Sequence, residues 1–126
     1  MKGRLQHGQT LVTLLIFMII GITITTAAVV MVIVNSRNVS RIEQGNDTLS
    51  IAESGVENAL IRLLRDPAYT GETLLVGTGS TVVQITTSGN EKTITSTAVQ
   101  GNFSRKLQVV LTVNGELTIT SWQEIF

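Results

Sequence analysis

Two glutamates are the first side chains in this sequence that could do chemistry. Glu53 and Glu57 are four residues apart, so a helix would place both carboxylates on one face, where a pair can act as general acid and general base. The residues around them indicate neither a pocket nor a metal site. A solvent-exposed polar face explains the pair better, and we expect no catalytic role for either glutamate.

The other residue types that usually carry catalysis or bind metals are scarce. The 126 residues include no cysteine and one histidine, His7, which excludes disulfides, thiolate nucleophiles and sites with several histidine ligands within this chain. Gly77-Thr78-Gly79 lacks the lysine and the following helix of a phosphate-binding loop. Tyr69 and Trp122 could form an aromatic binding surface, but isolated aromatic residues more often pack. We predict a protein that is not an enzyme, with no cofactor and no metal.

The net charge gives no indication of nucleic-acid binding, because nine basic residues offset nine acidic ones. The charges are unevenly spread, however, and there is no Asp, Glu, Lys or Arg from Leu5 to Ser36. As a helix with a rise of 1.5 Å per residue, the apolar segment 11–34 would be about 36 Å long, enough to cross a hydrocarbon core of roughly 30 Å. A cleaved secretory signal has a shorter apolar run. The sequence therefore predicts a membrane-spanning helix.

The basic residues on either side of this helix do not decide its orientation. Lys2 and Arg4 precede it, and Arg37 and Arg41 follow it. The polar residues after Arg41 form the only part of the chain large enough to fold into a domain. We therefore predict that the N-terminus stays in the cytoplasm and that the C-terminal part is exported.

The helical period continues beyond the apolar segment and becomes amphipathic. Large and small residues alternate along one stripe, each type recurring every seven residues: Ile42, Leu49, Val56 and Leu63 alternate with Gly45, Ala52 and Ala59. We interpret the stripe as a surface that packs on a sheet, because small residues allow close approach. A dimeric coiled coil is the alternative, but Gly or Ala would then fill one seam position over three heptads. Asp66-Pro67 ends the pattern, which predicts one helix from about residue 10 to residue 65.

The rest of the chain has the pattern of short strands joined by tight turns. Four segments alternate apolar or β-branched residues with polar ones, and Gly/Asn pairs separate them: 81–87, 92–99, 103–113 and 116–125. Asn114-Gly115 indicates a type I′ hairpin turn. We predict an α+β fold, in which a long N-terminal helix packs with its second half on a four-stranded antiparallel sheet.

The start of the chain combines a short basic tail, the pair Gly8-Gln9 and an apolar helix that follows without a gap. This arrangement resembles the prepilin leader of the type IV pilin and pseudopilin superfamily, in which a membrane aspartyl peptidase cuts after a glycine that precedes the apolar stretch. The resemblance implies cleavage between Gly8 and Gln9. Residues 1–8 would be the leader, 9–34 the transmembrane and filament-core helix, and 35–126 a pilin-like domain.

A second motif agrees with the first. Residues 52–59, AESGVENA, resemble the AE-x-G-(hydrophobic)-E-x-A segment of minor pilins of the PilX type. The resemblance implies a structural subunit of a type IV pilus or of a related secretion or DNA-uptake pseudopilus. Its partners would be other pilin subunits, the prepilin peptidase, the inner-membrane assembly machinery and, before assembly, membrane lipid. The chain would be a single-pass protein of the cytoplasmic membrane and then part of an extracellular or periplasmic filament, with a methylated N-terminus and a role in adhesion as further family traits.

Two positions depart from the family pattern. Gln9 stands where Phe or Met is common, and Thr13 stands where most members have a glutamate that neutralises a neighbouring subunit's N-terminal ammonium. A hydroxyl cannot offset a charge in a low-dielectric filament core. Thr13 therefore favours a minor or tip-proximal subunit, unless Gln9 cyclises to pyroglutamate and removes the charge itself. From a different class, the alternative function is a permanently membrane-anchored single-span protein with an extracytoplasmic binding domain.

Overall fold

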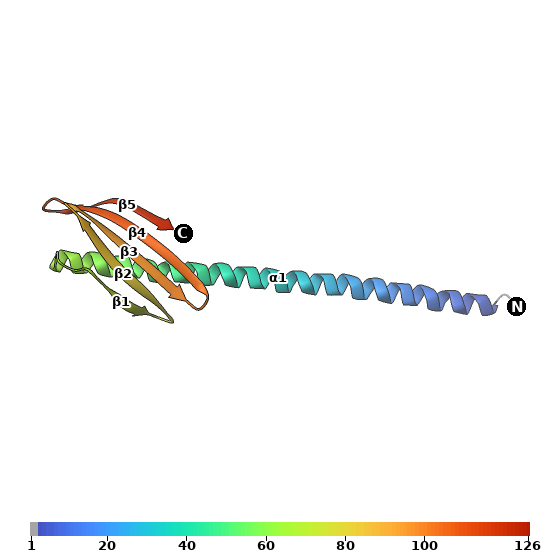
Figure 1. The fold of residues 1–126 in the computed structure, drawn as a ribbon. Coiled ribbons are helices and arrows are strands. Elements are labelled where there is room, and N and C mark those ends of the chain that lie inside the picture. The colour runs from blue at the N-terminus through green and yellow to red at the C-terminus, as the bar shows by residue number, and fades with distance from the viewer. Residues whose placement is uncertain (1–2) are drawn as a thin grey trace. The chain divides into compact units, whose positions relative to one another are not determined.

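The computed structural model describes residues 3–126, with side chains described from Gly8 onward, and it begins with a single long helix. This helix, α1, runs from Gly3 to Arg65 (Figure 1). The prediction of one helix ending at residue 65 is confirmed, although α1 begins earlier than residue 10. Of the predicted leader, Lys2 and the side chains of Arg4 and His7 lie outside the described residues.

The end of α1 follows from the residues around it. Asp66 still donates its backbone N–H to the carbonyl oxygen of Arg62 at 2.7 Å, but Pro67 has no N–H with which to continue the helix. Arg62 and Arg65 lie in the last turn, where positive charges interact favourably with the helix dipole.

The chain divides into two units, and the boundary between them falls inside α1. One unit comprises the residues up to Ser40, and the other comprises Arg41–Phe126. Of the described residues, the first unit contains helix alone, whereas the second contains the last turns of α1 together with the sheet.

The sheet has five antiparallel strands in the order β1-β2-β3-β4-β5, so each strand pairs with its neighbours in the sequence. The strands are β1 (Gly71–Val76), β2 (Gly79–Ser88), β3 (Glu91–Gln100), β4 (Phe103–Val113) and β5 (Leu117–Ile125). The antiparallel α+β fold is confirmed, but the number of four strands is wrong. The missed strand, β1, has six residues and begins soon after Pro67, and it pairs with β2 through a tight turn at Gly77-Thr78.

Three of the four hairpins have two-residue loops with positive φ at a leading glycine, namely Gly77 (58°), Gly89 (61°) and Gly101 (57°). Positive φ at the first loop residue alone is typical of type II′ turns. The fourth loop differs from the predicted type I′ turn. It spans three residues between β4 and β5, and only Gly115 has positive φ (86°), whereas type I′ requires positive φ at both central residues.

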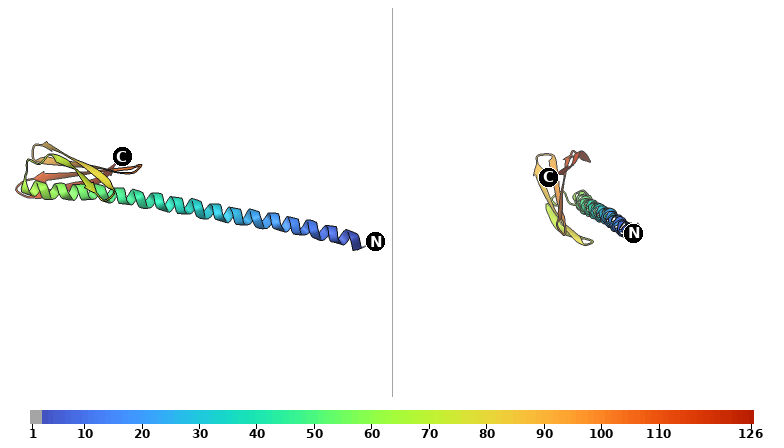
Figure 2. Two further views of the ribbon diagram at one scale, coloured as in Figure 1. Left: turned by 90° about the horizontal axis from the view of Figure 1, so that it is seen from below. Right: turned by 90° about the vertical axis from the view of Figure 1, so that its right-hand side faces the viewer.

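The core of the second unit lies between the last turns of α1 and one face of the sheet, and the strands lie alongside that end of the helix in Figures 1 and 2. On the sheet, the buried apolar residues alternate along the strands: Val83, Ile94, Ala98, Leu107, Val109 and Leu111. On α1, the buried residues recur every three or four positions: Gly45, Thr48, Ile51, Ala52, Gly55, Val56, Ala59 and Leu63.

The prediction for Ile42 is wrong, since its side chain is 64% exposed. Leu49 is half-buried, while Val56 and Leu63 are buried. An α-helix has 3.6 residues per turn, so a row with a spacing of seven drifts by about 20° per heptad. The row that faces the sheet at Leu63 has therefore turned toward solvent at Ile42, and the buried face begins at Gly45.

Candidate functional site

The apolar segment 11–34 is exposed along its whole length. Within the part of the chain that the structure describes, α1 is the one helix long and apolar enough to cross a membrane, judged by length and composition alone. Large side chains such as Phe17 (78% exposed) and Met31 (76%) lie open on its surface. The segment therefore has the surface expected of a helix surrounded by lipid or by other apolar helices.

The threonines of this segment use their hydroxyls within the helix. Thr25 donates to the carbonyl oxygen of Gly21 at 2.7 Å, and Thr23 and Thr26 each donate to a carbonyl three or four residues earlier at 2.8 Å. An unsatisfied polar group in hydrocarbon costs several kcal/mol. These back-bonded hydroxyls avoid that cost and leave the helix compatible with an apolar environment.

The predicted processing junction lies in the helix near its N-terminal end. Gly8 is exposed, and a Cβ added there would meet no heavy atom within 4 Å beyond its own turn. Gln9 is exposed as well, and its carbonyl oxygen accepts a hydrogen bond from the hydroxyl of Thr13 at 2.9 Å. The sequence contains no aspartate or glutamate before Glu43. The structure thus brings Gln9 and Thr13 together, and the only side-chain group that Thr13 offers is a neutral hydroxyl.

The segment 52–59 forms a close contact between α1 and the sheet. Its small and apolar residues face the sheet, with Ala52, Val56 and Ala59 fully buried. Glu53 and Glu57 are exposed on the opposite side of the helix. The alternation in this motif therefore separates a packed face from a solvated one.

Gly55 makes this close approach possible. A Cβ at Gly55 would lie 2.5 Å from the Oγ of Ser96 and 2.8 Å from the Cγ2 of Thr81, far closer than real contacts. The Ser96 hydroxyl donates to the Ala52 carbonyl oxygen at 2.8 Å, so its only proton is used and Thr81, at 2.7 Å, must donate to the Ser96 oxygen. A chain of two buried hydroxyls thus fastens β2 and β3 to the helix backbone.

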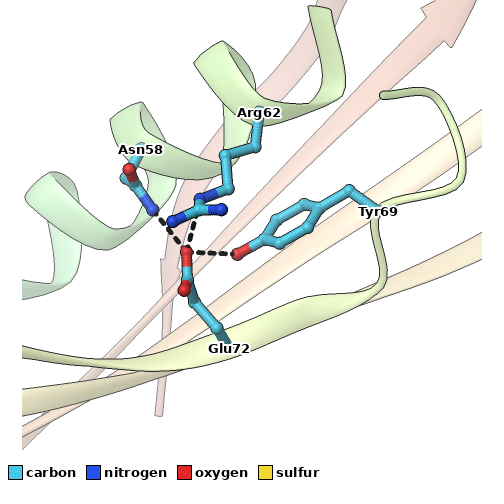
Figure 3. Close-up of polar contacts among 4 residues, drawn as sticks. All are labelled: Asn58, Arg62, Tyr69 and Glu72. Atoms are coloured by element: carbon cyan, nitrogen blue, oxygen red, sulfur yellow. Dashed lines mark hydrogen bonds and ion pairs between the residues drawn. The ribbon is translucent and has the colours of Figure 1, made fainter. Parts of the chain in front are cut away.

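A second polar cluster fastens β1 to the end of α1 (Figure 3). The Oε1 atom of Glu72 accepts hydrogen bonds from Asn58 Nδ2 and Tyr69 OH, both at 2.9 Å, and lies 2.6 Å from Arg62 Nε. The Arg62 guanidinium also lies over the Tyr69 ring, 5.6 Å from its centroid. Burial, the hydrogen bond to Glu72 and the charge of Glu72 raise the pKa of Tyr69 from 10.0 to about 12, against the opposing charge of Arg62.

This cluster was not predicted from the sequence, because β1 itself was not predicted. A possible signal was the i,i+4 spacing of Asn58 and Arg62, which puts an amide and a guanidinium on one helix face just before the turn. Tyr69 and Trp122 do not form a common aromatic surface. Tyr69 precedes β1 and Trp122 lies on β5, so the two aromatic residues belong to opposite edges of the sheet.

One hollow in the second unit is mainly apolar. It has a volume of about 670 Å³ and lies between the end of α1 and the β4–β5 hairpin, where Leu60, Leu64, Pro67, Leu117 and Ile119 contribute to its wall. No group of three or more potential metal-ligating side chains comes together among the residues that the structure describes. The hollow therefore offers apolar contact rather than a set of convergent polar groups.

Comparison of the chain with protein-family models, with curated proteins and with solved structures finds no match in any of the three.

Proposed function

We propose that this protein is a structural subunit of a type IV pilus or of a related secretion or DNA-uptake pseudopilus, matured by cleavage after Gly8. The observation that carries the proposal is the difference between the two parts of α1. Its segment 11–34 is apolar, uncharged and exposed along its whole length, while its last turns are the core element of an antiparallel sheet domain. A subunit that waits in lipid and then packs its helix against other helices requires this combination.

The surface of segment 11–34 suits both the membrane, before assembly, and the core of a filament, after assembly. In the membrane, its large apolar side chains face hydrocarbon and its threonine hydroxyls are satisfied by backbone carbonyls. On transfer into a filament core, apolar surface moves from lipid to protein, so close packing must direct assembly rather than the hydrophobic effect. If the Gln9 amine keeps its charge, Thr13 favours a minor or tip-proximal place in the filament, because no carboxylate at that position can neutralise a neighbour.

The mass of the membrane-extracted protein tests this proposal. Cleavage after Gly8 predicts a chain that begins at Gln9. Gly8→Leu should block cleavage, because a peptidase that approaches the backbone closely favours a residue without a side chain. Gly21→Leu is the matched control, since Gly21 is equally unhindered but lies within the apolar segment, and this variant should be cleaved like the parent. Cleaved Gly8→Leu protein would contradict the proposal.

The second candidate is a permanently anchored single-span protein with an extracytoplasmic binding domain. The apolar hollow between α1 and the β4–β5 hairpin favours it, because small ligands and peptides bind preferentially in such concave surfaces. An anchor keeps its N-terminal residues. Mature protein that retains residues 1–8 would support the anchored domain and reject the pilin proposal.

A further inference from the structure

We propose that Gln9, once cleavage after Gly8 exposes its amine, cyclises to pyroglutamate, so that the mature subunit begins with an uncharged lactam. This inference rests on the proposed function, since it requires Gln9 to become the N-terminal residue. It assigns a modification site to Gln9, which is exposed.

Cleavage would create a charge at Gln9 that no acidic side chain of the apolar segment can neutralise. A newly exposed amine is protonated near neutral pH and would lie at the head of an apolar helix. The sequence supplies no aspartate or glutamate before Glu43, and the Thr13 hydroxyl already donates its proton to the Gln9 carbonyl oxygen. A neutral hydroxyl oxygen can accept a hydrogen bond from an ammonium but cannot cancel its charge. An amide nitrogen in a lactam carries no charge, so ring closure removes the positive charge of the N-terminus.

The cyclisation needs only atoms of Gln9. The unprotonated α-amine attacks Cδ of the side-chain amide, and a new N–Cδ bond closes a five-membered ring. The Cδ–Nε2 bond breaks, and Nε2 leaves as ammonia with the proton that the amine gives up. No oxidant, reductant or second substrate enters, and the loss of ammonia drives the closure forward.

The surroundings of Gln9 leave room for the ring. The hydrogen bond between Thr13 and Gln9 uses the backbone carbonyl of Gln9, whereas ring closure uses its nitrogen and Cδ. Gln9 is exposed, so a ring at this position meets open space. A five-membered ring at the first residue of a helix is tolerated for the reason that proline is, since that residue has no preceding turn with which to bond or clash. The hydrogen bond to Thr13 can therefore survive the modification.

Intact mass and N-terminal peptide mass of the full chain, extracted from membranes or isolated filaments, test the inference. Cyclised protein has the mass of residues 9–126 less one ammonia. The mass of residues 9–126 with a free or methylated amine would overturn the inference and leave the proposed function standing. The mass of the whole chain, with residues 1–8 retained, would overturn the proposed function and the inference with it.

Gln9→Asn is the matched variant, because it keeps a side-chain amide but would have to close a strained four-membered ring. We expect it to be cleaved, to keep its amine and to lose incorporation into filaments relative to the parent. Adding Thr13→Glu to this variant supplies a carboxylate for the charge and should restore incorporation. Equal incorporation of Gln9→Asn and the parent, or an ammonia loss in Gln9→Asn as large as in the parent, would overturn the inference.

Discussion

Two stretches of the same helix, 11–34 and 45–63, differ in their surroundings, and the more apolar of the two is the one that is exposed. The first presents large side chains such as Phe17 and Met31 to its surroundings. The second buries small residues such as Ala52 and Ala59 against a sheet. Hydrophobicity alone therefore does not tell which part of this helix lies in the protein core. The small residues that recur on one stripe, Gly45, Ala52 and Ala59, mark the packed part, because a sheet can approach a helix closely only where residues are small.

Hydroxyls bond back to the helix in both regions, as those of Thr48 and Ser54 do in the packed region, but the packed region also has hydroxyls that reach it from the sheet. In the first stretch, threonines such as Thr25 bond back to their own helix. In the packed region, the hydroxyls of Ser96 and Thr81 come from the sheet and reach across to the carbonyl oxygen of Ala52. Self-satisfied hydroxyls leave the partner of a helix unspecified, whereas cross-bonded hydroxyls fix one register between helix and sheet. The comparison predicts that the two regions respond differently to the same substitution.

Substitution by aspartate should give the largest difference in domain stability between the packed region and segment 11–34. Ala52→Asp would bury an unpaired carboxylate at a position with no exposure, and the penalty of several kcal/mol is a large share of the stability of a small domain. Ile22→Asp should leave the domain folded but cost about 2.5–3.5 kcal/mol in membrane insertion. Trp122 is the only tryptophan and lies on β5, so its fluorescence during thermal unfolding of the detergent-solubilised chain reports on the sheet.

Membrane fractionation of the same two variants completes the test. Ile22→Asp should reduce the membrane-bound fraction while the Trp122 transition stays at the parental temperature. A transition lowered as much by Ile22→Asp as by Ala52→Asp would mean that segment 11–34 belongs to the cooperative unit of the sheet, and the contrast between the two regions would fail.

Replacing glycine by alanine should give the next largest difference in domain stability between the two regions. At Gly55 the new Cβ would lie 2.5 Å from Ser96 Oγ, and overpacking of this kind costs about 1–3 kcal/mol. At Gly21 a Cβ meets no heavy atom within 4 Å, so Gly21→Ala should leave the Trp122 transition unchanged. Combining Gly55→Ala with Ser96→Ala should cost less than the sum of the two single changes, because the second removes the atom that the first strikes. Strict additivity would place Gly55 away from this contact.

Much of the fold was predictable from the sequence because its signals were local. The absence of charge through segment 11–34, the stop at Asp66-Pro67 and the Gly/Asn pairs each act over a few residues. The stripe on α1 was predicted less accurately, because a spacing of seven fits a straight helix only over one or two repeats. The angular drift of this row increases with distance from Leu63, so Ile42 lies outside the core and is 64% exposed.

What the sequence did not predict depends on pairing between distant segments. β1 has six residues and becomes a strand because β2 pairs with it, and the cluster around Glu72 exists only once β1 lies beside the end of α1. The role of Gly55 was likewise hidden, because its need for space comes from Ser96 and Thr81, 41 and 26 residues later in the sequence. At the predicted processing junction no distant pairing is involved. Gly8, Gln9 and Thr13 lie within six positions of one another, so the sequence alone is enough to suggest their roles.

A pH titration should act on the packed region alone, since segment 11–34 has no titratable side chain. Burial and Glu72 raise the pKa of Tyr69 from 10.0 to about 12, so the folded chain holds this proton more tightly than the unfolded chain. The contribution of Tyr69 to stability is therefore complete below pH 10 and is lost as the pH rises from 10 to about 12. Tyr69→Phe should cost about 1 kcal/mol at neutral pH, by losing the hydrogen bond to Glu72. Denaturant unfolding followed by Trp122 fluorescence should show that the free energy of unfolding falls less steeply for this variant than for the parent between pH 10 and 12.

The smallest effect is expected on the outer face of α1. Glu57 is exposed, on the side of the helix away from the buried Val56 and Ala59, and substitutions at such positions usually change stability by less than about 0.5 kcal/mol. Glu57→Gln should therefore unfold at the temperature of the parent. Glu72→Gln is the matched control, because the same change there places an amide opposite three donors and should cost about 1–3 kcal/mol. Equal destabilisation by the two variants would mean that the outer face of α1 makes contacts of its own, and the separation of a packed face from a solvated face in segment 52–59 would have to be abandoned.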